Sequence, residues 1–140
     1  MSTETGQVHY YTGEIYYRTG QTERGLALLE KELEFFDRIG GEVFKAPEFH
    51  RIHGLLLASR GDPASATEAE QHYKTSLELA RMSEAKSYEL RSSICLARLW
   101  HSQGKTTEAR DLLAPVYGWF TEGFDTADLK EAKALLDELS

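Results

Sequence analysis

Apolar side chains recur at helical spacing through most of the chain. Between residues 22 and 38, large apolar residues at i, i+3, i+7 and i+10 share one helix face. These are Leu26, Leu29, Leu33 and Phe36. A second stripe, between residues 63 and 82, consists of Ala69, Tyr73, Leu77 and Ala80. No segment alternates apolar and polar positions in the way that a half-buried strand does. The pattern therefore predicts an all-α fold.

Short turn sequences separate the periodic segments. They lie at 20–22 (Gly-Gln-Thr), 40–41 (Gly-Gly), 61–63 (Gly-Asp-Pro) and 104–106 (Gly-Lys-Thr). Asp62 and Pro63 suit a helix start, because the carboxylate accepts a first-turn N–H and proline has no N–H to leave unpaired. Asp125, followed by Asp128, predicts an acidic capping box that opens a last helix. Its apolar face is Leu129, Ala132, Leu136 and Leu139. These boundaries predict about seven helices.

The turn glycines indicate an internal repeat. Gly20, Gly61 and Gly104 are separated by 41 and 43 residues, and each has a helical pattern on both sides. Each unit is therefore expected to be a helix hairpin. We predict a single domain over residues 1–140, with repeats at about 7–40, 46–83 and 86–121 and a capping helix at about 125–139.

Small residues recur on both helices of each predicted hairpin, where they let the two backbones approach closely. They are Gly13, Gly25, Gly54, Ala69, Ala97 and Ala109, and the large residues beside them are Tyr16, Leu29, Leu57, Tyr73, Trp100 and Leu113. This pattern resembles the tetratricopeptide repeat. The resemblance implies a right-handed superhelical stack of hairpins. The unit here is longer than the family's usual length of about 34 residues. His9, His50 and Ser93 replace the family's tryptophan.

The closing stretch, residues 109–139, resembles the C-terminal end of large bacterial signalling proteins that join an adenylate cyclase-type or winged-helix domain to an NTPase and a helical repeat array. Within it, Pro115 removes a backbone hydrogen bond, so we expect a kink followed by a loop. We expect the aromatic residues of this stretch to fold the loop back onto the last hairpin. They are Tyr117, Trp119, Phe120 and Phe124. The final helix is expected to close the end of the stack.

Composition narrows the classes of partner and compartment. The chain has 16 Lys plus Arg against 23 Asp plus Glu, a net charge of -7, which disfavours nucleic acid. The single cysteine, Cys95, allows neither a disulfide nor a cysteine zinc site within one chain. The N-terminus lacks the features of a signal peptide, and no apolar stretch reaches membrane-spanning length. We expect a cytoplasmic protein that does not bind membranes.

Three short motifs favour structural roles over chemistry. Residues 104–106 (Gly-Lys-Thr) mimic the end of a phosphate-binding loop, but Leu99 stands where that loop needs glycine. Residues 60–62 (Arg-Gly-Asp) fall in a helix turn. His50 and His53 have a spacing that could serve a metal, with His9 as a possible third ligand, but no carboxylate motif accompanies them. We therefore predict no catalytic residues, no metal and no cofactor.

The concave face is the main functional candidate, because the first helix of each hairpin lines it in tetratricopeptide arrays. The family resemblance places eight residues there: Tyr10, Glu14, Tyr17, Arg51, Leu55, Arg91, Arg98 and His101. This predicted groove is mixed but locally basic. Its arginines could bind a partner's carboxylate or could pair with acidic residues of their own helices. Tyr10, Tyr11, Tyr16 and Tyr17 could form a stacking surface or pack against a further repeat.

We interpret the sequence as a non-catalytic scaffold that binds a partner protein or peptide in the concave groove. The alternative is a regulatory or self-associating end of a bacterial signal-transduction enzyme, linked to a cyclase or NTPase, with homo-oligomer contacts through the tyrosine-rich first hairpin. A metal-dependent enzyme that uses the histidines is the least favoured hypothesis.

Overall fold

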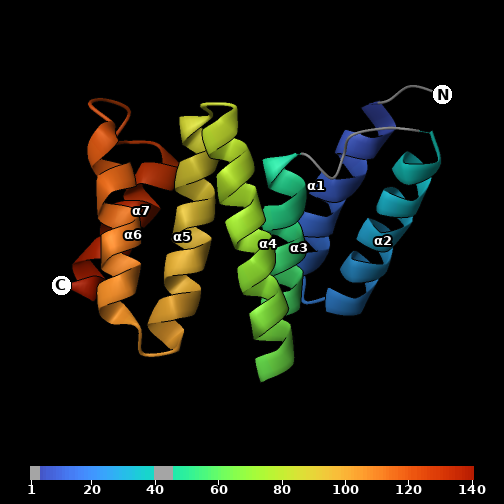
Figure 1. Ribbon diagram of the computed structural model, residues 1–140, viewed down its shortest axis with the longest axis horizontal. Helices are drawn as coiled ribbons and strands as arrows, with labels where there is room; N and C mark the ends of the chain where they lie inside the picture. Colours follow the sequence, from blue (N-terminus) through green and yellow to red (C-terminus); the bar gives the residue numbers. More distant parts are fainter. Residues whose placement is uncertain (1–3, 40–45) are drawn as a thin grey trace.

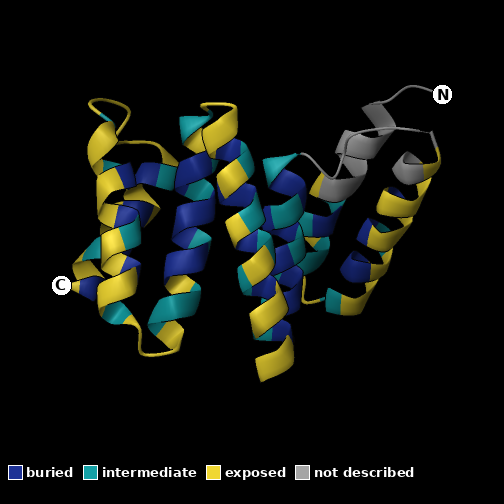
Figure 2. Ribbon diagram, in the orientation of Figure 1, coloured by how far each residue is buried: buried dark blue, intermediate teal, exposed yellow. Residues whose placement is uncertain are grey.

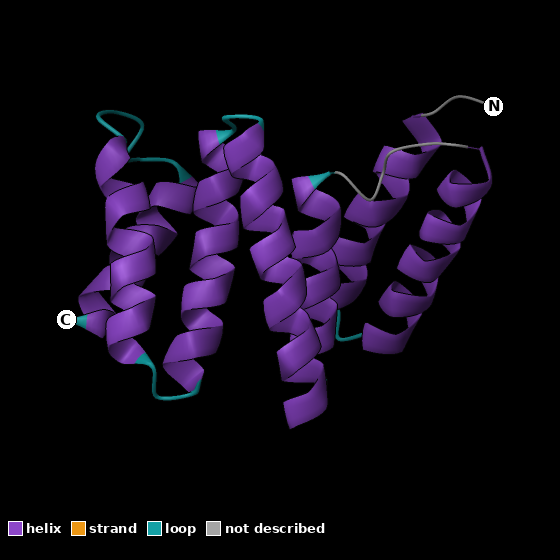
Figure 3. Ribbon diagram, viewed as in Figure 1, coloured by secondary structure: helices purple, strands orange, loops and turns teal. Residues whose placement is uncertain are grey.

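The computed structural model describes residues 4–39 and 46–140, and the side chains of residues 11–35, 38 and 46–140. Helices account for nearly all of this part of the chain, which contains no strand (Figure 3). The described helices are α1 (Glu4–Arg18), α2 (Thr22–Ile39), α3 (Pro47–Ala58), α4 (Pro63–Met82), α5 (Lys86–Ser102), α6 (Thr106–Trp119) and α7 (Ala127–Leu139). The predicted all-α class is confirmed.

The helices pair into hairpins that stack in chain order (Figure 1). Helix α1 packs against α2, α3 against α4, and α5 against α6. Contacts between α1 and α3, α3 and α5, and α4 and α5 join neighbouring hairpins. Helix α7 packs against both α5 and α6 at the end of the row. The predicted stack of tetratricopeptide-like hairpins with a final helix is therefore present, whereas the division into repeats stays a prediction.

Three of the hairpin turns use the predicted glycines. Gly20, Gly61 and Gly104 have positive φ angles of 75°, 79° and 81°, a region that disfavours residues with a Cβ. Such a residue just past a helix reverses the chain and satisfies the last carbonyl groups of that helix. The turn between α4 and α5 uses Glu84 instead, with φ of 55°. That turn contains no glycine and lies between the predicted bounds of the second and third repeats, 46–83 and 86–121.

The core fills the spaces between neighbouring helices, both within hairpins and between them (Figure 2). All six small residues of the predicted repeat pattern are buried. Around them lie two apolar clusters. The first, centred on α3 and α4, includes Phe49, Ile52, Leu56 and Tyr73. The second joins α5, α6 and α7 through Leu90, Leu113, Leu129 and Leu135. The stack is thus one continuous series of packed helices, which holds the first helices of the hairpins side by side.

The stripe predicted on α2 is only half correct. Leu26 and Leu29 are buried, but Leu33 is 39% exposed, and the Phe36 side chain lies outside the described residues. Helix α2 belongs to the first hairpin and has a neighbouring hairpin on one side only among the described residues. Its outer positions therefore stay in contact with solvent.

Two local predictions for the C-terminal region need correction. Thr126, not Asp125, caps α7, because the Thr126 hydroxyl accepts the Leu129 N–H at 3.4 Å. Helix α6 also continues through Pro115 to Trp119, so the loop begins one turn later than expected. Pro115 and Asp111 are both exposed, so water can satisfy the Asp111 carbonyl that a proline N–H would have bonded.

The aromatic residues of this region divide into two pairs. Tyr117 and Phe120 pack against the second core cluster, as predicted. Trp119 and Phe124 are 57% and 45% exposed, contrary to the expectation that all four would fold onto the last hairpin. Both are nevertheless held at one side, because Lys86 of α5 lies over the Trp119 ring and the Phe124 ring lies 5.8 Å from that of Tyr117.

Candidate protein-binding groove

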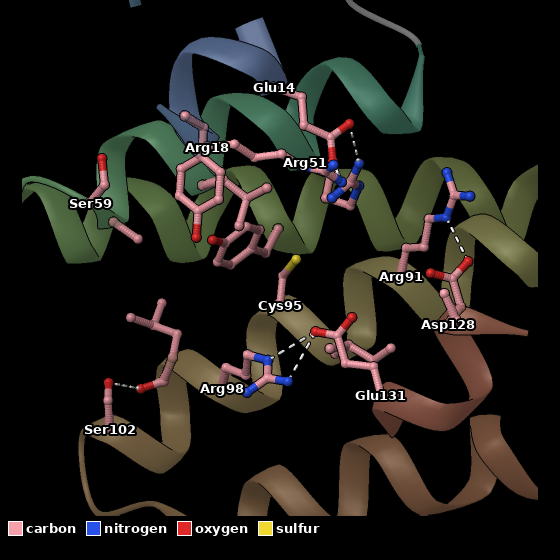
Figure 4. Close-up of a pocket in the computed structure, with 17 residues that line it drawn as sticks. Glu14, Arg18, Arg51, Ser59, Arg91, Cys95, Arg98, Ser102, Asp128 and Glu131 are labelled. Carbon is pink, nitrogen blue, oxygen red and sulfur yellow. Dashed lines mark hydrogen bonds and ion pairs between the residues drawn. The ribbon is translucent and has the colours of Figure 1, made fainter. Parts of the chain in front are cut away.

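One groove of about 630 Å³ runs across α1, α3, α5 and α7 (Figure 4). Six of the eight predicted groove residues line it: Glu14, Tyr17, Arg51, Leu55, Arg91 and Arg98. His101 does not line it, and its Nδ1 atom is buried without a hydrogen-bond partner. The Tyr10 side chain lies outside the described residues. Whether the groove binds a partner remains a prediction.

The floor of the groove is a buried ion pair within α3. Arg51 donates two hydrogen bonds to Glu48, from Nε to Oε1 at 2.9 Å and from Nη2 to Oε2 at 2.8 Å. Arg51 is 7% exposed and Glu48 is 1% exposed. Burial is the largest single effect and lowers the pKa of Arg51, but the hydrogen bonds that Arg51 donates to Glu48 and the nearby negative charges together outweigh it, so this pKa lies above its ordinary value. Arg51 therefore stays charged inside the protein.

Ion pairs extend from this centre to the neighbouring helices. Arg51 Nη2 lies 3.5 Å from an oxygen of Glu14 on α1, and Glu14 in turn accepts a hydrogen bond from Arg18. On the other side, Arg91 of α5 contacts Glu48 at 3.3 Å and donates to Asp128 of α7 at 2.8 Å (Figure 4). These residues form what we call the charge ladder: Arg18, Glu14, Arg51, Glu48, Arg91 and Asp128. The ladder links α1, α3, α5 and α7.

Arg98 lies beside the ladder and has its own partner. It donates two hydrogen bonds to Glu131 of α7, at 3.0 and 3.2 Å, and both side chains are about half exposed (Figure 4). Each of the three predicted groove arginines thus has a carboxylate within the chain. Only Arg51 uses its own helix, and the other contacts cross between helices. The arginines that were expected to make the groove locally basic are thus each paired with a carboxylate.

Helix α7 is the contribution that sequence analysis missed. Asp128 and Glu131 line the groove, although the sequence indicated only a closing helix. The residues lie at i and i+3 of α7, so they share a face. This acidic pair is visible in the sequence. The direction in which its two side chains point, however, depends on how α7 packs against α5.

Between the charges, the groove wall is apolar. Leu55, Ile94, Leu99 and the half-buried Cys95 line it together with Tyr73. Burial raises the pKa of the Cys95 thiol to about 11, despite the nearby Arg51 guanidinium, which opposes this change. A thiol with this pKa is protonated near neutral pH and is a poor nucleophile. The wall suits contact with apolar groups better than covalent chemistry.

The histidines form a cluster outside the groove. His50 and His53 of α3 meet His72 of α4, which sequence analysis did not single out. The Nδ1 atoms of His50 and His72 are 3.1 Å apart, and the rings of His53 and His72 stack with centroids 4.0 Å apart. Burial and the neighbouring histidines lower the pKa of His53 to about 3 and of His72 to about 4.

His53 and His72 are therefore neutral near pH 7. The rings of His50 and His53 meet Phe49 edge-on. The side chain of His9, the predicted third member, lies outside the described residues. Over the described ranges, no group of three or more His, Cys, Asp or Glu side chains is arranged to hold a metal ion. The cluster therefore serves the packing of α3 on α4.

The two motif-like turns have structural roles. Lys105 and Gly104 form the turn between α5 and α6, with the Lys105 N–H bonded to the Trp100 carbonyl at 2.8 Å. Arg60 pairs with Glu23 of α2 at 2.8 Å, and Asp62 caps α4 by accepting the Ser65 N–H at 2.9 Å.

Among the described helices, none combines the length and apolar character needed to cross a membrane.

Comparison with protein families finds a match within the third hairpin. Residues 90–115 match a tetratricopeptide repeat family, and this segment covers most of α5, the turn at Gly104 and the greater part of α6. The match supports a tetratricopeptide-type identity for the third hairpin. Comparisons with curated proteins and with solved structures find no match.

Proposed function

We propose that this protein is a non-catalytic scaffold that binds a segment of a partner protein in the groove across α1, α3, α5 and α7. Tetratricopeptide repeats in general mediate protein–protein interactions, and the match at residues 90–115 supports that class. The observation that carries the proposal is the groove itself, a continuous hollow of about 630 Å³ lined mainly by α1, α3, α5 and α7.

The charge ladder favours a groove that is formed before a partner arrives. Its ion pairs connect the four lining helices, and Glu48 and Arg51 at its centre are almost fully buried. A surface already held in place lowers the ordering cost of binding an extended or helical segment. The exposed pair of Arg98 and Glu131 offers both charges to such a segment. We propose a polypeptide partner, and the net charge of -7 argues against nucleic acid.

Filling the groove tests this proposal. Ser102 lines the groove and is exposed, so Ser102→Trp should block it without disturbing the core. The matched control is Gln71→Trp, because Gln71 is an exposed residue of α4 that does not line the groove. Proteins captured from the source organism by the parent chain and by Gln71→Trp should be lost with Ser102→Trp. Equal capture by both variants would show that partners bind elsewhere.

A second candidate is self-association as the regulatory end of a cytoplasmic bacterial signalling protein linked to a cyclase or NTPase. The observation that favours it is the apolar surface of the first hairpin, where Ile15 is 59% exposed and Leu33 is 39% exposed. Of the first helix's tyrosines, Tyr11 is 39% exposed, Tyr16 lies under Arg24 and Tyr17 lines the groove. Light scattering should then show an oligomer that Ile15→Lys dissociates, whereas a concentration-independent monomer would exclude this candidate.

A further inference from the structure

A second exposed surface lies where the α4–α5 turn meets the loop after α6. Both connections are at the same edge of the stack, the upper edge in Figure 1. We call this surface the loop-end patch. It consists of Arg81, Glu84, Lys86, Trp119 and Phe120, which line one hollow, and of Glu122, Phe124 and Asp125 from the adjoining loop. None of the residues lining the hollow lines the groove.

Trp119 is the central feature of the loop-end patch. Its indole is 57% exposed, the largest exposed fraction of any aromatic side chain in the described residues. Lys86 Nζ lies 5.3 Å from the ring centroid, and Phe120 meets the ring edge-on with centroids 5.1 Å apart. The indole is therefore restrained although it is exposed. Restrained, exposed tryptophans are well suited to protein contacts, because little further side-chain entropy is lost on binding.

A hollow of about 580 Å³ lies beside this ring. One wall is formed by Trp119 and Phe120, and the other by Arg81, Glu84 and Lys86 around the α4–α5 turn. Glu84 is the residue with positive φ in that turn, and its side chain is exposed. The hollow is large enough for one long side chain and adjoins a flat aromatic surface.

The uncompensated charge at this end is negative. Glu89 is buried and accepts hydrogen bonds from both local cations, Arg81 at 3.1 Å and Lys86 at 3.2 Å. By contrast, Glu84, Glu122 and Asp125 are exposed and form no ion pair with any described residue. A ligand that approaches this surface therefore meets two cations that are already paired with Glu89 and three carboxylates that form no ion pair with a described residue.

We propose that the loop-end patch binds a basic segment of a partner protein. Lysine or arginine side chains of that segment pair with Glu84, Glu122 and Asp125, and its apolar groups pack on the exposed indole of Trp119. This surface is separate from the groove and does not depend on the function proposed for the groove.

The test uses a synthetic peptide of alternating lysine and leucine, with an alternating glutamate and leucine peptide as the charge control. The indole N–H resonances of the ¹⁵N-labelled full chain report binding. The two tryptophans separate the surfaces, because Trp100 is partly buried and donates its indole N–H to Glu70 at 3.0 Å. We expect the basic peptide to shift the Trp119 resonance and leave that of Trp100 in place, and the acidic peptide to shift neither.

Two triple variants with equal net charge separate this surface from general attraction to an acidic protein. Glu84→Gln, Glu122→Gln and Asp125→Asn together should weaken binding of the basic peptide about tenfold. The matched variant neutralises three exposed carboxylates elsewhere, Glu30→Gln, Glu34→Gln and Glu138→Gln, and should retain most of the affinity. Equal weakening by both variants, an unshifted Trp119 resonance, or equal binding of the acidic peptide would overturn the proposal.

Discussion

Gly54 of α3 lies against the ring of Tyr73 of α4. A Cβ atom at position 54 would come within 2.5 Å of Tyr73 Cε1 and 2.7 Å of Cδ1. Tyr73 is only 2% exposed and belongs to the first core cluster, so a shift of its ring would disturb the packing around it. This contact sets how closely α3 and α4 pack, and it explains why a small residue is needed at this point of the hairpin.

We therefore expect Gly54→Ala to destabilise the protein by about 1–3 kcal/mol through overpacking, even though alanine favours helices more than glycine does. Urea unfolding followed by circular dichroism measures the change. Gly118→Ala on α6 is the control, because no atom lies within 4 Å of a Cβ at that position. It should be neutral or stabilising by up to about 1 kcal/mol. Similar losses in both variants would contradict the packing explanation.

The centre of the charge ladder should tolerate paired changes better than single ones. Arg51→Ala leaves Glu48 buried with only the longer contact to Arg91, and we expect a loss of about 3–5 kcal/mol. Replacing both residues, as Arg51→Met with Glu48→Leu, removes both buried charges and should cost clearly less. Thermal unfolding of the two variants makes the comparison. A double variant less stable than the single one would contradict this account of the ladder.

The histidine cluster should make stability depend on pH. The pKa values of His53, about 3, and His72, about 4, lie below the value of about 6.5 for an unfolded chain. The unfolded state therefore binds more protons in acid. The contribution of these two histidines to the free energy of unfolding is fully present above about pH 6.5 and is lost as the pH falls toward 4 and 3. For His53 alone the loss is about 2 kcal/mol at most by pH 5.

Urea unfolding at several pH values measures this slope. His53→Leu should make it shallower, and it also removes a buried Nδ1 atom that has no hydrogen-bond partner. His101→Gln leaves the three-histidine cluster intact and is expected to keep the parent slope. If His53→Leu kept the same slope between pH 6.5 and pH 4, another group would be responsible.

The start of α7 offers a test of the corrected cap. Thr126→Ala removes the side-chain oxygen that accepts the Leu129 N–H, so we expect a loss of about 0.5–1 kcal/mol. Asp125→Ala should have little effect, because Asp125 does not cap the helix. Thermal melts of the two variants distinguish them. A larger loss for Asp125→Ala would restore the cap that the sequence pattern indicated.

Features that depend on near neighbours in the chain were predictable. The start of α4 at Pro63, its cap at Asp62 and the glycine turns at 20, 61 and 104 all follow from backbone preferences of the residues involved. The small residues at hairpin contacts, such as Gly54 and Ala97, were also visible as a repeated pattern. Turns, caps and the buried face of a helix each depend on residues that lie within a few positions of one another in the chain. They can therefore be predicted from a short stretch of sequence.

Contacts between helices were much less predictable. The sequence by itself determined seven helical segments, three glycine turns and six of the groove residues, the last through a family resemblance. Only the tertiary structure decided that Arg91 meets Asp128, that His72 joins His50, and that Trp119 faces solvent. Each of these outcomes depends on how one helix is rotated and shifted against another. That geometry is set by packing over the whole stack, and a local pattern does not specify it.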